Sequence, residues 1–137
     1  MKCSRRDLGF LFPLVAVAQQ QRQRLPSKAY AFDELSVREN GPNRSRAIFD
    51  GLTHNGFRIE IHNTELAPGQ TPHAPHRHLR DEMVIVKEGA VEVTIEGRSS
   101  KLGPGSVVYI NSNEEHGLRN VGANRAQYFI LALGLDQ

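Results

Sequence analysis

The segment 46–137 alternates apolar and polar residues in short stretches. In residues 57–62 every second residue is Phe or Ile, and the residues between them are charged or polar. Residues 91–96 repeat the pattern with Val and Ile. A period of two is typical of a β-strand that buries one face. Because Gly and Pro turns recur at short intervals and no long helical period is present, the sequence predicts one all-β domain, a barrel or a sandwich.

Three predicted strands carry apolar residues on both faces. They are residues 83–86, 107–110 and 128–133. A small barrel buries only its inner face, so another layer must cover the outer faces of these strands. A second copy of the chain is the expected cover, with residues 19–45 as the other candidate. The sequence therefore predicts a homodimer.

Residues 19–45 differ from the segment that follows them. They are polar and interrupted by Pro26, Gly41 and Pro42. This composition predicts an N-terminal extension or linker with little structure of its own, apart from a short turn of helix at residues 32–35. The sequence leaves open whether the extension packs on the barrel or is disordered.

Residues 1–18 have the pattern of an export signal. Arg5 and Arg6 precede an apolar run, and the Ala-Val-Ala of residues 16–18 is a small-residue cleavage site. The apolar run is too short to span a bilayer as a helix. The segment resembles a bacterial twin-arginine signal, which implies a periplasmic or secreted protein with no membrane association once the signal is removed. A buried N-terminal helix is the alternative.

Charge and cysteine content narrow the function classes. The formal net charge of +2 arises entirely within residues 1–18, so the chain from residue 19 onward is neutral. A neutral body without a cluster of basic residues argues against nucleic acid as a partner. Cys3, the only cysteine, also lies in the predicted signal. Any metal site of the mature protein must therefore use His and carboxylate ligands.

Histidines are concentrated in the loop that precedes the apolar run at residues 83–86. His76 and His78 are separated by one residue, and on an extended backbone such side chains point to the same face, roughly 7 Å apart. Two imidazoles on one face can bind one metal ion, and Glu82 can approach from the same side. This spacing indicates a metal site rather than a solvated loop, with His116 as the candidate for a further ligand.

The same residues resemble the two sequence motifs of the cupin superfamily, in particular its small single-domain, conserved-barrel members. The first motif is present as Gly69, His76, His78, Glu82 and Gly89. The second is present as Gly105, His116 and Asn120. The chain departs from the motifs by one extra residue after Gly69, by Ser106 where an acidic residue is common, and by Asn111 in place of Pro. None of these departures falls at a ligand position, and the resemblance covers residues 46–135.

The resemblance implies a cupin barrel, a double-stranded β-helix of jelly-roll type, over residues 46–137. It further implies one divalent metal inside the barrel, held by His76, His78, Glu82 and His116. Three imidazoles and one carboxylate suit Mn, Fe, Co, Ni, Cu or Zn, and this ligand set does not choose among them. Coordination positions left open would admit water or substrate.

Four further residues are candidates for the pocket around the metal. His62 lies on the polar face of its strand, which turns toward the interior if the metal is there. His73 lies in the Pro-rich loop and is expected at the pocket entrance. Tyr109 and Tyr128 offer phenol groups to a ligand, although aromatic residues in apolar strands more often belong to the core.

The resemblance implies a metal-dependent enzyme that acts on a small molecule. The family includes dioxygenases, isomerases, decarboxylases and aminohydrolases, and the fold does not select one reaction. The metal would act as a Lewis acid on a substrate oxygen or bind dioxygen beside a chelating substrate. Glu82 is a candidate base if it releases one metal bond. The alternative is a non-catalytic periplasmic protein that binds a metal or a small ligand.

Overall fold

The computed structural model describes residues 22–135, so the predicted export signal lies outside the described residues. A 3₁₀ helix, η1 (Phe32–Glu34), precedes nine strands. The strands are β1 (Arg38–Asn40), β2 (Asn43–Leu52), β3 (Arg58–Leu66), β4 (Asp81–Glu88), β5 (Val91–Ile95), β6 (Arg98–Leu102), β7 (Val107–Ile110), β8 (His116–Asn120) and β9 (Ala126–Gly134). No helix within residues 22–135 has both the length and the apolar character needed to span a bilayer.

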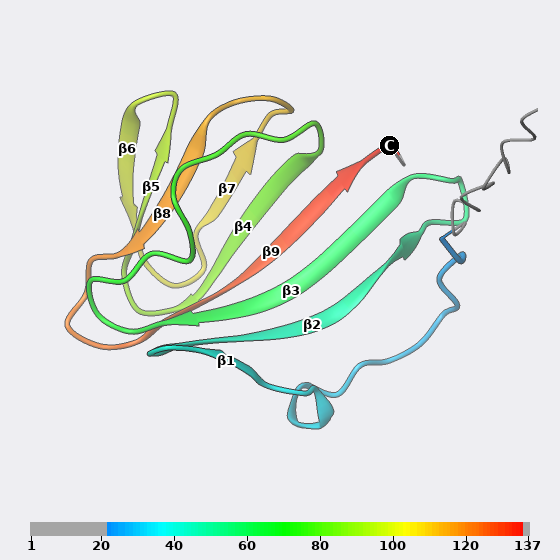
Figure 1. Ribbon diagram of the computed structural model, residues 1–137, viewed down its shortest axis with the longest axis horizontal. Coiled ribbons are helices and arrows are strands. Elements are labelled where there is room, and N and C mark those ends of the chain that lie inside the picture. Colours follow the sequence, from blue (N-terminus) through cyan, green and yellow to red (C-terminus); the bar gives the residue numbers. More distant parts are fainter. Residues whose placement is uncertain (1–21, 136–137) are drawn as a thin grey trace, which may run out of the picture.

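The strands form two antiparallel sheets that face each other (Figure 1). One sheet has six strands in the order β1-β2-β3-β9-β4-β7, and the other has three in the order β6-β5-β8. Both sheets contribute to a single apolar core. Its buried residues are Leu66, Val84, Val86, Val91, Val93, Ile110, Leu118, Ala126, Tyr128 and Ile130. The structure therefore confirms the predicted all-β, single-domain barrel.

Polar side chains mark where the strand prediction differs from the structure. The predicted strand at residues 57–62 is longer in the structure and runs on to Leu66 as β3. Asn63 is buried within it, and its side-chain amide donates to the Tyr128 carbonyl at 3.0 Å. β6 and β8 have no alternating apolar pattern in the sequence. They are strands because each pairs with one edge of β5, residue for residue.

The N-terminal extension is part of the fold from residue 22 onward. The Leu25 amide donates to the Leu52 carbonyl at 2.9 Å, the Leu52 amide donates to the Gln23 carbonyl at 3.0 Å, and these bonds add the extension to the end of β2. η1 forms within the predicted segment 32–35, and its Phe32 ring packs edge-on against Phe129 of β9 at 6.4 Å between centroids. The extension therefore covers part of the outer face of the large sheet, and β2 begins before residue 46.

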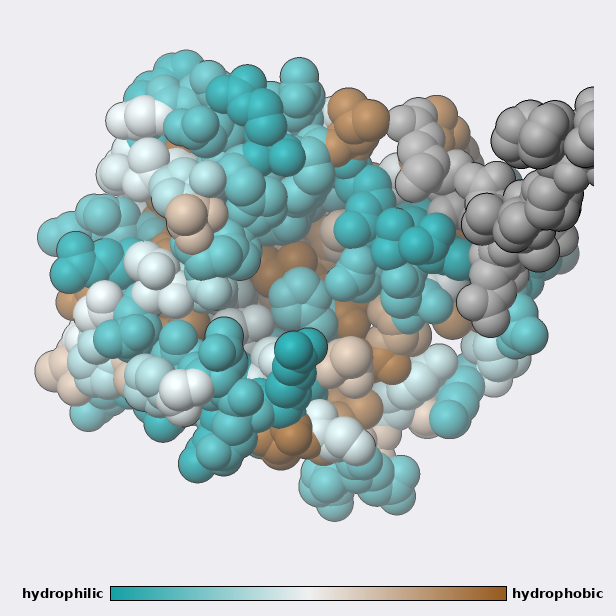
Figure 2. Space-filling model, in the orientation of Figure 1, coloured by the Kyte–Doolittle hydropathy of each residue, from teal (hydrophilic) through white to brown (hydrophobic). Residues whose placement is uncertain are grey.

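The outer face of β4 and β7 remains open in the described chain. Ile85 and Val107 lie opposite each other in the strand pairing and are 39% and 60% exposed. Tyr109, on the same face of β7, is 54% exposed. These three residues form an apolar patch, called here the β4–β7 patch. The space-filling view shows a mostly polar surface with apolar groups between the polar ones (Figure 2).

Two glycines with positive φ provide a matched test of packing in this fold. Gly89 has φ of 80°, and an added Cβ would lie 2.7 Å from both the Ala126 Cα and the Arg125 carbonyl oxygen. Gly97 has φ of 77° and open space around the same position. Gly97→Ala should therefore lose about 1 kcal/mol of stability through backbone strain alone.

Gly89→Ala should lose at least about 2 kcal/mol more than Gly97→Ala, because the clash is with backbone atoms that cannot rotate away. Urea unfolding of both variants measures the difference. Equal losses for the two substitutions would show that the contact at Gly89 does not constrain the fold.

Candidate metal centre

Backbone pairing brings the predicted ligand segments together. His76 lies in the loop between β3 and β4, and His116 is the first residue of β8. The two residues form an isolated antiparallel bridge in which each amide donates to the other's carbonyl, at 3.0 and 2.9 Å. Asn113 also donates its amide to the His78 carbonyl at 2.7 Å. Segments distant in sequence are therefore fixed side by side independently of their side chains.

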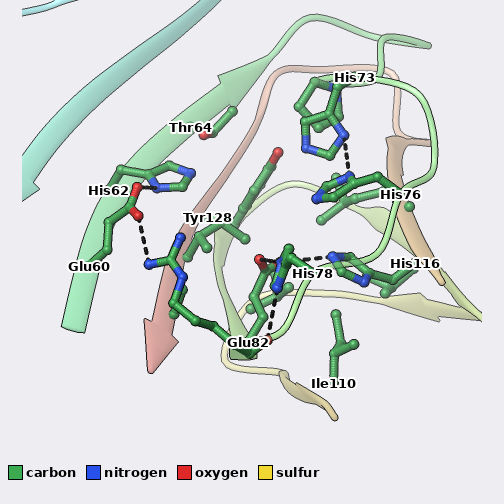
Figure 3. Close-up of a pocket in the computed structure, with 18 residues that line it drawn as sticks. Glu60, His62, Thr64, His73, His76, His78, Glu82, Ile110, His116 and Tyr128 are labelled. Atoms are coloured by element: carbon green, nitrogen blue, oxygen red, sulfur yellow. Dashed lines mark hydrogen bonds and ion pairs between the residues drawn. The ribbon is translucent and has the colours of Figure 1, made fainter. Parts of the chain in front are cut away.

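Three histidine side chains converge at this bridge (Figure 3). One ring nitrogen from each of His76, His78 and His116 lies within 4.8 Å of the other two. His116 is 5% exposed, and its Nε2 is buried without a hydrogen-bond partner among the described residues. A buried polar atom without a partner is costly, and a metal ion would satisfy it. The arrangement fits one transition-metal ion bound by imidazole.

Glu82 faces the same point from the start of β4. Its Oε2 lies 3.0 Å from the His78 Nε2, and its Oε1 lies 3.7 Å from the His116 Nε2. The carboxylate is largely buried, with 13% of its side chain exposed. Glu82 therefore lies beside the three imidazoles, and its role as a fourth ligand stays a prediction.

Backbone carbonyls orient two of the imidazoles. The His78 Nδ1 donates to the Arg80 carbonyl at 2.8 Å, and the His116 Nδ1 donates to the Glu114 carbonyl at 2.9 Å. The Nε2 atoms, which face Glu82, are then left to bind a metal in exchange for contacts such as the 3.0 Å hydrogen bond between the His78 Nε2 and the Glu82 Oε2. The hydrogen bonds to the two carbonyls lie outside this ligand set. Such outer hydrogen bonds fix the tautomer and the ring orientation of metal-binding histidines.

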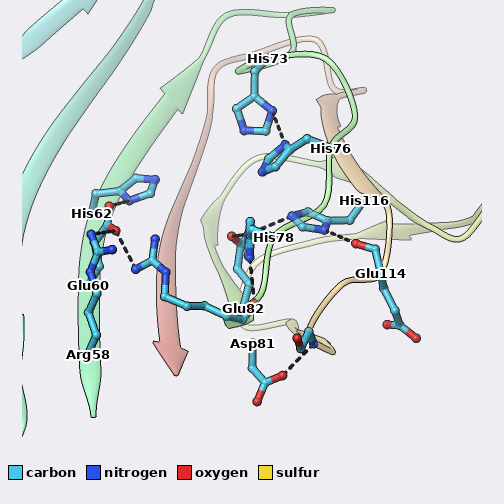
Figure 4. A network of polar contacts seen from close by, with 12 residues as sticks. Arg58, Glu60, His62, His73, His76, His78, Asp81, Glu82, Glu114 and His116 are labelled. Carbon is cyan, nitrogen blue, oxygen red and sulfur yellow. Dashed lines mark hydrogen bonds and ion pairs between the residues drawn. The ribbon is translucent and has the colours of Figure 1, made fainter. Parts of the chain in front are cut away.

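The third imidazole of the cluster, His76, has a hydrogen-bond partner in His73 instead of a backbone carbonyl. The His73 Nδ1 lies 3.0 Å from the His76 Nδ1, so one nitrogen donates to the other (Figure 4). Burial lowers the pKa of His76, and the neighbouring His73 and His116 lower it further. A lowered pKa favours the neutral imidazole, which is the form that binds metal. His73 thus contacts a ligand histidine and lines the pocket as well.

A cavity of about 220 Å³ adjoins the histidines. Its apolar lining comes from both sheets and includes Val84, Val93, Ile110, Leu118 and Ile130. Its polar wall is β3, which contributes Glu60, His62 and Thr64 on one face, with Tyr128 of β9 beside them (Figure 3). The cavity therefore combines an apolar interior with polar groups on two opposite walls.

Only one of the two tyrosines predicted for the pocket lies in it. Tyr128 is 1% exposed and lines the cavity, and burial raises the pKa of its hydroxyl, which keeps it protonated. Tyr109 does not line this cavity. It follows Val108 and precedes the inward Ile110, so strand alternation turns its side chain outward to the β4–β7 patch. Tyr109 is thus corrected from a pocket residue to a surface residue.

Three polar residues of the pocket were not predicted from the sequence, namely Glu60, Thr64 and Arg80. Glu60 and Thr64 point inward with His62 because all three share the same parity on β3. Their spacing of two residues from His62 could have predicted that Glu60 and Thr64 share its face of the strand. Arg80, which hydrogen-bonds Glu60 at 2.9 Å, comes from the loop before β4, and no sequence pattern marks it.

Fold and site together define a small β-barrel with a histidine-rich centre inside it. The family model for the cupin domain matches residues 62–132, which is more than half of the chain. The chain therefore belongs to the cupin family, as the two motifs predicted.

Curated relatives match part of the chain. L-ectoine synthase of Bordetella parapertussis is 34% identical over 68 residues, which are 49% of this chain and 52% of that protein. L-ectoine synthase of Bordetella petrii is 32% identical over 68 residues, with 49% and 51% covered. The chain thus spans about half the length of the curated relatives it matches.

Solved structures share the fold. KdgF from Halomonas sp. has a TM-score of 0.67 at 19% identity, covering 80% of this chain and 96% of that one. A predicted oxalate decarboxylase from Thermotoga maritima has a TM-score of 0.66 at 18% identity, with 79% and 100% covered. The polyketide cyclase RemF from Streptomyces resistomycificus has a TM-score of 0.64 at 21% identity, with 79% and 80% covered. At these identities the likeness shows the fold alone.

Metal binding should depend on the clustered histidines. His116→Ala removes the buried Nε2, so we expect the metal affinity to fall by at least about 100-fold, whereas His73→Ala removes only an outer partner and should cost about 10-fold. Titration calorimetry with Zn²⁺ and metal analysis after dialysis measure both effects.

His54→Ala is the matched control because, among residues 22–135, the hydrogen bond of His54 is made by its backbone carbonyl, which accepts from the Arg24 guanidinium. It should bind metal as the unmodified protein does. Full affinity in His116→Ala would contradict the assignment of the centre.

Proposed function

We propose that this protein is a mononuclear, metal-dependent cupin enzyme that acts on a small organic substrate. The observation that carries the proposal is the convergence of His76, His78, His116 and Glu82 at a cavity of about 220 Å³. An apolar pocket with a few convergent polar groups is the usual form of a small-molecule site. The reaction class, whether dioxygenase, isomerase or hydrolase, is not fixed by this ligand set.

The three histidines and Glu82 would hold one divalent ion, Mn, Fe, Co, Ni, Cu or Zn. When bound, such an ion supplies Lewis-acid chemistry at a substrate oxygen or binds dioxygen. Hydrogen bonds from the His78 and His116 Nδ1 atoms keep the ligand nitrogens aimed at one point. Reorganisation of the ligands on binding is therefore small.

The cavity walls would select the substrate. The apolar lining excludes water from one part of it, which strengthens polar interactions elsewhere in the cavity. Thr64 and the protonated hydroxyl of Tyr128 line the cavity and hydrogen-bond each other, so the pair together would meet a substrate oxygen. These features suit a compact molecule with an apolar body and at least one oxygen donor.

The relatives' names support an enzyme. The curated relatives are L-ectoine synthases, and the structures of similar fold include a polyketide cyclase and a predicted oxalate decarboxylase. Because these names denote different reactions, they favour catalysis without selecting the type. Glu82 as a base stays a prediction, since both of its oxygens face ligand imidazoles.

The proposal is tested by loading metal-free protein with each of the six ions and assaying catechols, flavonols and keto acids with and without dioxygen. We expect turnover with at least one ion and a loss of at least about 100-fold in His116→Ala. Turnover only with dioxygen identifies a dioxygenase. A filled metal site with no turnover across the panel would favour the alternative, a protein that binds a metal or small ligand without catalysis.

We also propose export by the N-terminal signal and a homodimer in which a second copy covers the β4–β7 patch. The patch is the support for the dimer, because η1 reaches Phe129 but leaves Val107 and Tyr109 exposed.

Cells that express the full chain are fractionated, and the exported protein is analysed by light scattering. Retention in the cytoplasm contradicts export, and a monomer at micromolar concentrations contradicts the dimer.

A further inference from the structure

We propose that His62 is the proton-transfer residue of this pocket and that Glu60 positions it. The inference rests on the proposed function and assigns a role to a wall of the cavity that the metal ligands do not occupy. His62 lies on β3 and faces the cavity, opposite the three clustered histidines (Figure 3). It does not belong to their cluster, so its imidazole is available for chemistry.

A group of charged side chains lies beside the Nδ1 of His62. The Glu60 Oε1 lies 3.7 Å from the His62 Nδ1. The other oxygen, Oε2, accepts a hydrogen bond from Arg80 at 2.9 Å and lies 3.7 Å from the Arg58 guanidinium (Figure 4). Two guanidinium groups thus fix the carboxylate, and the carboxylate attracts the N–H of the imidazole. The 3.7 Å separation between Nδ1 and Oε1 is longer than a hydrogen bond, so the attraction is electrostatic here, and contacts of catalytic groups often shorten when substrate binds.

This arrangement selects one tautomer. A carboxylate beside Nδ1 favours the proton on that nitrogen, and the lone pair is then on Nε2. The same logic, a carboxylate that orients an imidazole base, recurs in unrelated enzymes. Glu60 therefore acts through His62 and does not need to touch the substrate.

The environment of His62 keeps the imidazole neutral. Burial lowers its pKa from the ordinary value of 6.5, and this effect outweighs the carboxylates of Glu60 and Glu82, which raise it. His73 and Arg80 face it from the loop before β4 and lower the pKa further. A neutral imidazole at neutral pH can accept a proton, as a general base must.

His62 also has a route for exchanging its proton with solvent. It lines both the cavity beside the clustered histidines and a neighbouring groove of about 480 Å³ along β1 and β2. About a third of its side chain is exposed. The imidazole therefore lies between the reacting volume and an opening that contains polar residues, including Arg38 and Arg44.

The chemistry that suits this wall is proton transfer at a carbon next to a carbonyl group. The His62 Nε2 lone pair forms an N–H bond, the substrate C–H bond breaks, and its electron pair moves into the adjacent carbonyl. The imidazolium then returns the proton to another atom of the same substrate. The two proton transfers leave the substrate with the same atoms and need no oxidant or reductant. The inferred substrate is therefore a carbonyl compound that the protein isomerises.

The first test is nitrogen NMR of the imidazole rings in zinc-loaded protein, which is diamagnetic. We expect His62 to be neutral at pH 7 with its proton on Nδ1. Glu60→Gln should lower the pKa of His62 further and remove the preference for one tautomer. Glu34→Gln is the matched control, because Glu34 is an exposed residue of η1 that lines neither the cavity nor the groove, and it should leave His62 unchanged.

The second test is kinetic and uses His62→Gln and His62→Ala in whichever metal form turns over a keto acid. Turnover should fall by about 100- to 10,000-fold while the metal content stays unchanged. Added imidazole should restore part of the activity of His62→Ala, which a purely structural role would not allow. His54→Gln is the control and should keep full activity.

The outcomes distinguish this inference from the proposed function. Turnover within twofold of the unmodified protein in His62→Gln overturns the inference, even though the metal-dependent enzyme stands. A protonated His62 at pH 7, or a proton on Nε2 that Glu60→Gln does not affect, overturns it as well. If no substrate is turned over, the proposed function fails, and the NMR result still decides whether His62 has the state of a base.

Discussion

The reciprocal backbone hydrogen bonds between His76 and His116 are the constraint on which the site depends. They place two candidate metal ligands side by side although one lies in a loop and the other begins β8. Further bonds anchor the same loop at its start, where the Gly69 amide donates to the Asn120 carbonyl and the Asn120 amide donates to the Gln70 carbonyl. The loop is thus held at both ends, and the ligands are arranged before any metal binds.

Asn120 connects this loop to the core. Its side-chain amide donates to the Leu66 carbonyl at 2.9 Å and the Asn124 carbonyl at 2.8 Å, and its oxygen accepts from the Gly122 amide. All these groups are paired, so a fully buried polar side chain is retained at little cost. Asn120, the last residue of the second cupin motif, therefore has a structural role. Its hydrogen bonds join three backbone segments, which explains its presence in the motif without a part in the chemistry.

Strand alternation decides which residues share the pocket. β3 turns Glu60, His62 and Thr64 toward the cavity, whereas on β7 the same rule turns Tyr109 to the surface and Ile110 inward. The strands with clear alternation were predictable from the sequence, and so was the all-β class. β6 and β8 were not, because their polar residues become strands only through pairing with β5. Tyr128 was ambiguous until its burial was known.

The sequence by itself determined the all-β class through its periodicity, and the candidate cluster of His76, His78 and Glu82 through its short-range spacing. The resemblance of two separate segments to the cupin motifs added His116 as a candidate ligand. The tertiary structure alone decided that Glu82 faces two imidazoles, that Arg80 anchors Glu60, and that His73 contacts His76. These contacts join segments distant in sequence, or depend on the path of a loop, and neither is set by a local pattern. These contacts form only when the two sheets pack around one core and bring the segments together.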